Sequence, residues 1–232
     1  MKLIPCFLMA LNIASGCSKS ADTPVTTFPL NTSGLSYLAL GDSYTIGESV
    51  SEAESFPYQL ASSLSRNGIA VSNIKVIAKT GWTTNELKSA IAAQNLKQHF
   101  DVVTLLIGVN NQFRGYSSEV YRKEFNELLN AGISFAKGDK TKVFVISIPD
   151  WGATPFAKSY DRTKIAEDID LFNAINKEES LKVGVAYTDI TEESRNVATD
   201  PSLVAPDGLH PSGKMYAYWA SQLLPKIESK IK

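Results

Sequence analysis

The sequence has 232 residues, of which 44% are hydrophobic and 20% are charged, with a formal net charge of −1. These values are typical of a globular protein, and the length is sufficient for one domain with a sizeable core. The balanced charge gives no electrostatic reason to expect a nucleic-acid partner, and no apolar run reaches the roughly 20 residues that a membrane-spanning helix needs.

The N-terminus has the order of segments that is typical of a secretory signal peptide. Lys2 precedes the mostly apolar stretch 3–13, and small residues at 14–16 come directly before Cys17. This order resembles a bacterial lipobox, although Ala14 stands where leucine is commonest. We therefore expect an exported lipoprotein, held by lipid on Cys17 at the periplasmic or cell-surface face of a membrane, with the outer membrane favoured. The alternative is a plain signal peptide cleaved nearby, with Cys17 incidental.

The chain is predicted to divide into a signal peptide over 1–16, a lipidated cysteine with a flexible tether over 17–34, and one domain over 35–232. Residues 18–33 are rich in Ser, Thr, Asp and Pro and show no apolar period. The only cysteines are Cys6 and Cys17, and Cys6 would leave with the signal peptide. No disulfide framework is expected, so the domain must be held together by its core.

Strand-like and helix-like segments alternate through the predicted domain. Apolar and β-branched runs predict strands over 35–40, 71–78, 101–107, 142–148 and 183–187. Helical spacing of apolar residues predicts helices over 56–66, 84–96, 118–136, 163–181 and 212–231, with a kink or break at Pro225. The run at 101–107 is nearly continuous, which indicates a strand buried on both faces. The order predicts a three-layer α/β/α sandwich with a parallel sheet of about five strands.

Polar residues follow the predicted strands at the points where each strand ends. Ser43 follows the first strand, Gly81 the second and Asn110 the third, while Asp207 and His210 lie on the long loop after the fifth. In open α/β sheets, ligands bind at the carboxyl ends of the strands. We therefore expect a hydroxyl, backbone donors, an amide, a carboxylate and an imidazole at one edge of the sheet.

Four short motifs in this region resemble those of the SGNH/GDSL hydrolase family. They are Gly-Asp-Ser at 41–43, Gly81, Gly-x-Asn at 108–110 and Asp-x-x-His at 207–210, in the order in which the family carries them. The resemblance implies a flavodoxin-like SGNH hydrolase fold and a serine esterase. One departure is Asn111, where many members have aspartate.

The residue types themselves support nucleophilic catalysis. A serine hydroxyl is a poor nucleophile until a base takes its proton. Of the two histidines, His99 lies at a predicted helix end, so His210 is the candidate base for Ser43. Asp207 can accept the Nδ1–H of His210 and fix its tautomer. An ordinary turn or a helix cap at Asp207 is the alternative.

Acyl transfer also needs hydrogen-bond donors for the developing oxyanion. The candidates are the backbone N–H groups of Ser43 and Gly81 and the side-chain amide of Asn110. The alternatives are a turn glycine at Gly81 and a helix cap at Asn110. Asp42 is expected to orient the nucleophile loop through backbone hydrogen bonds, with no part in proton transfer.

No metal or cofactor is expected for this chemistry. The predicted mechanism has two steps, in which Ser43 attacks an ester carbonyl and water then hydrolyses the acyl-enzyme, with His210 as base and acid. The acidic cluster Glu167, Asp168 and Asp170 has no histidine or cysteine neighbour and indicates a solvated helix face.

The substrate is less clearly indicated. Aromatic residues on loops near the predicted site could form a wall for a sugar ring or an acyl chain, or could be packing residues. The candidates for substrate contact are Trp82, Asn111, Phe113 and Trp151, with Tyr116 and Phe156 as further members of the wall. The family resemblance favours short acyl groups such as acetyl on carbohydrate. The alternatives are a lysophospholipase or thioesterase, or a non-catalytic glycan-binding lipoprotein. We expect a small-molecule or glycan ester as the partner, and a monomer.

Overall fold

The computed structural model describes residues 34–231. The predicted signal peptide, Cys17 and all but the last residue of the predicted tether lie outside this range. Within it, none of the helices is both long enough and apolar enough to cross a membrane.

The domain is built on a single sheet of five parallel strands. The strands are β1 (Leu35–Gly41), β2 (Val71–Ala78), β3 (Val102–Leu106), β4 (Val143–Ile146) and β5 (Ala186–Thr188). Their spatial order is β2-β1-β3-β4-β5, and every neighbouring pair is parallel. The chain therefore reverses its direction of travel across the sheet between β1 and β3, which is the switch point at which open α/β sheets bind ligands.

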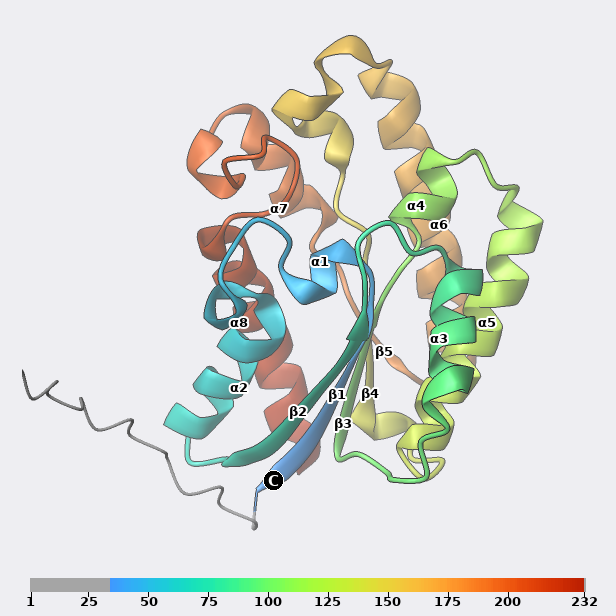
Figure 1. Cartoon of the computed structure of the whole chain (residues 1–232), viewed down its shortest axis with the longest axis vertical. Coiled ribbons are helices and arrows are strands. Elements are labelled where there is room, and N and C mark those ends of the chain that lie inside the picture. Colours follow the sequence, from blue (N-terminus) through green and yellow to red (C-terminus); the bar gives the residue numbers. More distant parts are fainter. Residues whose placement is uncertain (1–33, 232) are drawn as a thin grey trace, which may run out of the picture. The chain divides into compact units, whose positions relative to one another are not determined.

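Helices cover both faces of this sheet (Figure 1). α2 (Phe56–Arg66) and α8 (Gly213–Ile231) pack together on one face, while α3 (Thr84–Gln94), α5 (Ser118–Phe135) and α6 (Arg162–Val183) cover the other. Every residue of β3 and β4 is buried, as a strand between two helical layers must be. The predicted three-layer α/β fold with five parallel strands is confirmed.

Most predicted elements agree with the observed ones to within a few residues, but the fifth strand does not. The predicted strand 183–187 begins too early, because α6 continues to Val183. Gly184 then ends the helix in the left-handed conformation, with φ 83°, and β5 starts at Ala186.

Pro225 lies inside the last helix. The helix does not break at this residue, because α8 continues through it to Ile231. The buried side of α8 carries Tyr216, Trp219, Leu223 and Ile227, which pack into the core on both sides of the proline. This packing stabilises the helix against the loss of one backbone hydrogen bond.

Several short elements at the carboxyl edge of the sheet were not predicted. They include α1 (Ser43–Ile46) after β1, α4 (Val109–Phe113) after β3 and α7 (Thr191–Arg195) after β5. Helices of four or five residues are too short to show an apolar period. Each of the three follows a strand, and the first two carry candidate site residues.

Candidate active site

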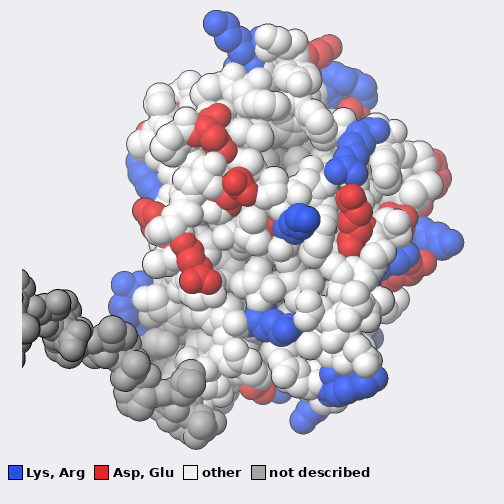
Figure 2. Space-filling model, in the orientation of Figure 1, with Lys and Arg blue, Asp and Glu red and all other residues white. Residues whose placement is uncertain are grey.

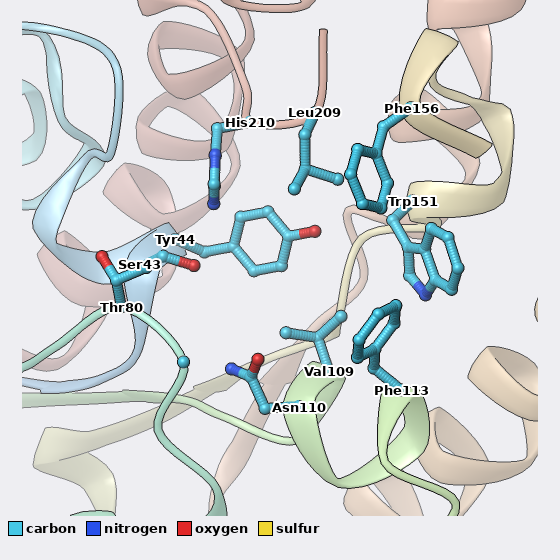
Figure 3. Close-up of a pocket in the computed structure, with 11 residues that line it drawn as sticks. Ser43, Tyr44, Thr80, Val109, Asn110, Phe113, Trp151, Phe156, Leu209 and His210 are labelled. Carbon is cyan, nitrogen blue, oxygen red and sulfur yellow. The ribbon is translucent and has the colours of Figure 1, made fainter. Parts of the chain in front are cut away.

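A cavity of about 180 Å³ opens at the carboxyl ends of β1, β2 and β3, beside the switch point. Figure 3 shows the side chains that face it, and they come from the segments that follow each of the five strands. The residues that line the cavity are Ser43, Tyr44, Thr80, Gly81, Val109, Asn110, Phe113, Trp151, Phe156, Leu209 and His210. Four of the five residues expected to carry the chemistry are therefore in one cavity, and Asp207 lies directly behind His210.

Ser43 lies at a tight strand-to-helix turn. β1 ends at Gly41, Asp42 caps α1 by accepting a hydrogen bond from the Tyr44 N–H at 3.0 Å, and Ser43 is the first helical residue. The N–H of a first helical residue has no acceptor within its own helix. The turn thus places Ser43 at the cavity, with an N–H that its own helix does not use.

Asp42 is fully buried beneath this turn. Its Oδ1 accepts the Tyr44 N–H, while Oδ2 has no hydrogen-bond partner within residues 34–231. Burial raises the pKa of this carboxyl to about 7, and the hydrogen bond from Tyr44 offsets the effect only in part. The expected backbone contact of Asp42 is present, and the carboxyl does not line the cavity.

The Asp207–His210 pair forms a compact turn. The Asp207 Oδ2 lies 2.6 Å from His210 Nδ1, and Oδ1 accepts the backbone N–H groups of Leu209 and His210 at 2.9 and 3.0 Å. Partial burial raises the pKa of the Asp207 carboxyl, but its hydrogen bonds outweigh burial and hold the pKa well below its usual range. Asp207 is therefore a charged acceptor that fixes the imidazole by its Nδ1 side. In Figure 3 the opposite edge of the ring points toward the Ser43 hydroxyl.

Gly81 and Asn110 face the cavity from two different loops. Gly81 has φ 84°, a left-handed conformation that favours glycine, and a Cβ there would meet nothing closer than 3.7 Å. The conformation of Gly81, rather than lack of space, is thus the reason for glycine. The Arg114 guanidinium donates a hydrogen bond to the Gly81 carbonyl at 2.6 Å, which fixes the plane of that residue's backbone.

Asn110 is oriented by a hydrogen bond to the backbone of the loop that follows β2. Its Nδ2 donates to the Trp82 carbonyl at 3.0 Å, and the amide has a second N–H. Gly108, which begins α4, has φ 133°, and a Cβ there would lie 2.4 Å from the Tyr121 hydroxyl. Only glycine therefore fits at the point where β3 turns into α4 and presents Asn110.

Asn111 points away from the cavity, into the protein. It is fully buried, its Oδ1 accepts the Thr84 N–H at 2.9 Å, and its Nδ2 donates to the Thr84 Oγ at 2.7 Å. Thr84 Oγ in turn donates to Glu124. Asn111, expected at the substrate, instead holds the start of α3 against α4.

The aromatic candidates divide into two groups. Phe113, Trp151 and Phe156 line the cavity, and the Phe113 and Trp151 rings meet edge to face with centroids 5.4 Å apart. The indole N–H of Trp151 donates to Gln112 Oε1 at 2.8 Å. Trp82 and Tyr116 do not line the cavity, and Trp82 instead packs partly against the core.

Some residues at the site were not singled out by the sequence analysis. Four of them line the cavity, and each is the chain neighbour of a candidate residue: Tyr44, Thr80, Val109 and Leu209. Ser49 donates to Asp207 and Arg114 donates to Gly81. Adjacency to a candidate could have indicated the four lining residues, but no sequence pattern indicates Ser49 or Arg114.

The surface around the site carries charges of both signs. Figure 2 shows Lys, Arg, Asp and Glu side chains distributed over this face, with largely uncharged surface between them. The cavity itself holds a hydroxyl, an imidazole anchored by a carboxylate, and amide donors, while the rest of its wall is apolar. These are the groups that acyl transfer requires.

Several solved structures with this fold are named as esterases or acylhydrolases. The chain is similar to a lipase/acylhydrolase from Enterococcus faecalis, with 19% identity, 85% of this chain and 97% of that chain covered, and a TM-score of 0.63. It is also similar to an acetyl xylan esterase variant from Geobacillus stearothermophilus, with 18% identity, 84% and 94% coverage, and a TM-score of 0.62. A psychrotrophic esterase from Pseudoalteromonas sp. has 14% identity, 84% and 97% coverage, and a TM-score of 0.63. At these identities the likeness is one of fold.

The sequence also matches a family model. No curated protein matches it significantly. The model of the GDSL-like lipase/acylhydrolase family, however, matches residues 39–218, which is most of the chain and extends from β1 into α8. The match includes all four short motifs that line or support the cavity. The chain therefore belongs to the GDSL-like lipase/acylhydrolase family and is an ester-hydrolysing enzyme of the SGNH type.

Proposed function

We propose that this enzyme hydrolyses carboxylic esters through a Ser43–His210–Asp207 triad. His210 Nε2 takes the Ser43 proton as the hydroxyl oxygen attacks the ester carbonyl, and the same proton passes to the leaving alcohol as the C–O bond breaks. Water then gives a proton to His210 and attacks the acyl-enzyme, and that proton returns to Ser43. The products are a carboxylic acid and an alcohol.

The observation that carries the proposal is the arrangement around His210. Its Nδ1 lies 2.6 Å from an Asp207 carboxylate whose pKa is held low, and the other ring edge points toward Ser43. A carboxylate that stays charged orients the imidazole and stabilises the imidazolium that forms. The Ser43 and Gly81 N–H groups and the Asn110 amide are then the proposed oxyanion donors.

Hydrolysis of p-nitrophenyl acetate tests the triad. We expect Ser43→Ala and His210→Ala to lower kcat by about 10³-fold or more, with unfolding curves like that of the wild type. A fluorophosphonate should modify wild-type Ser43, identified by peptide mass, and should leave Ser43→Ala unmodified. Activity that survives in Ser43→Ala would refute the nucleophile assignment.

For the substrate, we propose a short acyl group such as acetyl, carried by a carbohydrate. A cavity of about 180 Å³ suits a small acyl group, and half-exposed Phe113 and Phe156 at its wall offer ring faces to a sugar. One protein with the same fold is an acetyl xylan esterase.

A second candidate is a longer acyl chain, as in a lysophospholipid or an acyl-thioester. The apolar wall formed by Val109, Leu209 and Trp151 favours it, because alkyl groups gain free energy on leaving water. The two candidates differ in how kcat/KM depends on acyl length. For the acetyl proposal, kcat/KM should fall steadily from acetyl to octanoyl p-nitrophenyl esters, and acetylated xylose should be a better substrate than lysophosphatidylcholine.

A further inference from the structure

A serine outside the four motifs contacts the acid of the proposed triad. Ser49 lies in the segment between α1 and the next helical turn, and its Oγ donates a hydrogen bond to Asp207 Oδ2 at 2.6 Å. The same carboxylate oxygen lies 2.6 Å from His210 Nδ1. Ser49 and His210 therefore hold one oxygen of Asp207 from two directions, while the other oxygen accepts backbone N–H groups.

The backbone at Ser49 adopts a conformation that serine disfavours. Its φ is 67°, in the left-handed region where glycine is ordinary and serine is not. Within residues 34–231, the other two non-glycine residues with positive φ are Asn95 and Lys137, which lie at the ends of α3 and α5. Such positions are common at helix ends. Ser49 is exposed and is the third residue of a turn in which the Val50 N–H donates to the Gly47 carbonyl at 3.2 Å. The turn accounts for the positive φ, but that position favours glycine or asparagine, so neither packing nor capping explains a serine there.

The segment that carries Ser49 is held on its other side as well. The neighbouring Glu48 accepts a hydrogen bond from the Thr80 hydroxyl, directly before Gly81. The segment begins where α1 ends at Gly47, four residues after Ser43. It thus connects the nucleophile turn to the glycine loop through Glu48 and to the Asp207 turn through Ser49.

Strain of this kind at a contact with a reactive group indicates a functional constraint. The hydrogen bond from Ser49 is among the contacts that keep Asp207 charged against the effect of its partial burial. It also restrains Oδ2, the oxygen that contacts His210 Nδ1. Without this donor, Asp207 would keep its Oδ1 contacts with two backbone N–H groups, but Oδ2 would be held less firmly, and the imidazole would lose part of its alignment with Ser43.

We propose that Ser49 is a positioning residue for catalysis, the fourth member of a series Ser49–Asp207–His210–Ser43 in which Asp207 contacts both Ser49 and His210 at 2.6 Å. The inference rests on the proposed triad. Ser49 acts through Asp207 and touches neither substrate nor nucleophile. Its loss should therefore lower kcat and leave KM almost unchanged, because the alignment matters in the transition state and the cavity wall is intact.

Two substitutions separate the hydroxyl from the backbone. Ser49→Gly removes the hydroxyl and relieves the conformational cost, whereas Ser49→Ala removes the hydroxyl and retains that cost. We expect both to lower kcat on p-nitrophenyl acetate by about tenfold, in line with the loss of a hydrogen bond to a charged group. Ser49→Gly should unfold at a higher temperature than Ser49→Ala. Ser51→Ala is the matched control, since its hydroxyl in the same segment contacts only Glu54.

A double-mutant cycle tests whether Ser49 acts through Asp207. In an Asp207→Ala background, Ser49→Gly should cause no further loss of kcat. An equal loss in both backgrounds, or an unchanged kcat in Ser49→Gly, would overturn the positioning role. If the proposed triad itself were wrong, Asp207→Ala would keep the kcat of the wild type, and this outcome distinguishes the two failures.

Discussion

Asn110 and Asn111 are adjacent and have the same side chain, but their amides make different contacts. The Asn110 amide faces the cavity and donates one N–H to the Trp82 carbonyl. The Asn111 amide is buried and makes two hydrogen bonds to Thr84. Since consecutive residues of a helix point about 100° apart, α4 can direct one amide to substrate and the other to its scaffold.

Replacement of Asn110 should therefore affect catalysis rather than stability. We expect Asn110→Ala to lower kcat by about 10²–10³-fold, the usual cost of one oxyanion donor. The amide is only partly buried, and its removal leaves one group, the Trp82 carbonyl, to form a hydrogen bond with water instead. The free energy of unfolding should therefore change by less than about 1 kcal/mol. Steady-state kinetics and urea unfolding measure the two effects. A large loss of stability with unchanged kcat would contradict the oxyanion role.

At position 111 this chain has asparagine, where many members of the family have aspartate. The contacts of Asn111 indicate what the amide provides that a carboxylate could not. An amide can both accept from the Thr84 N–H and donate to the Thr84 hydroxyl, which leaves the hydroxyl proton for Glu124. A carboxylate at position 111 could not donate, so two carboxylates would compete for one proton.

We expect Asn111→Asp to lower the free energy of unfolding by about 1–3 kcal/mol, because a buried acceptor would lose its donor. Adding Glu124→Gln should recover part of this loss, because a glutamine amide can supply the missing N–H to the Thr84 hydroxyl. Urea unfolding of the two single variants and the double variant provides the comparison. Additive losses would show that Asn111 and Glu124 are not linked through Thr84.

At the scale of elements, α1 has only four residues and depends on its surroundings. Its cap, Asp42, is fully buried, and its carboxyl pKa is raised to about 7 by burial. A raised pKa in the folded state means that the protonated form is favoured there. Between the ordinary pKa near 3.8 and about 7, the unfolded chain would ionise this group while the folded chain would not.

Stability should therefore fall as pH rises through this window, by an amount on the order of 4 kcal/mol at most. Asp42→Asn retains an acceptor for the Tyr44 N–H and carries no charge, so it should flatten this part of the curve. Chemical unfolding at pH 4 to 8 measures the slope. Asp207, whose pKa is lowered, stabilises the fold above its ordinary pKa and loses that effect only as pH falls. An Asp42→Asn curve parallel to that of the wild type would contradict the assignment.

The elements that sequence reasoning predicted well are those with long local patterns. Helix 56–66 and strand 71–78 have the observed bounds, since an apolar period or a β-branched run defines each. The fifth strand has only three residues. The first residue predicted for it, Val183, belongs to α6, which Gly184 caps. A helix that packs along its whole length extends past the point where local pattern alone would end it.

At the scale of the molecule, the order of strands brings the candidate residues together. Ser43 follows β1 and Asn110 follows β3, and these strands are neighbours because the sheet order is β2-β1-β3-β4-β5. The rule that ligands bind at the carboxyl ends of parallel strands was enough to predict which loops converge. It could not predict Ser49, because the contact with Asp207 joins loops 158 positions apart and has no local pattern.

The lipid anchor predicted at Cys17 lies outside the described residues 34–231. The short run of small residues before Cys17 predicts a lipid anchor, and the candidate active site lies entirely within residues 34–231. Cys17→Ser should therefore move the protein from the membrane fraction to the soluble fraction when it is expressed in a bacterium that processes lipoproteins. Its kcat/KM on a soluble ester should equal that of the wild type, because the substitution lies far along the chain from every cavity residue. Mass spectrometry of the N-terminal peptide should show the acylated cysteine in the wild type alone. Unchanged membrane association of Cys17→Ser would refute the anchor while leaving the triad untouched.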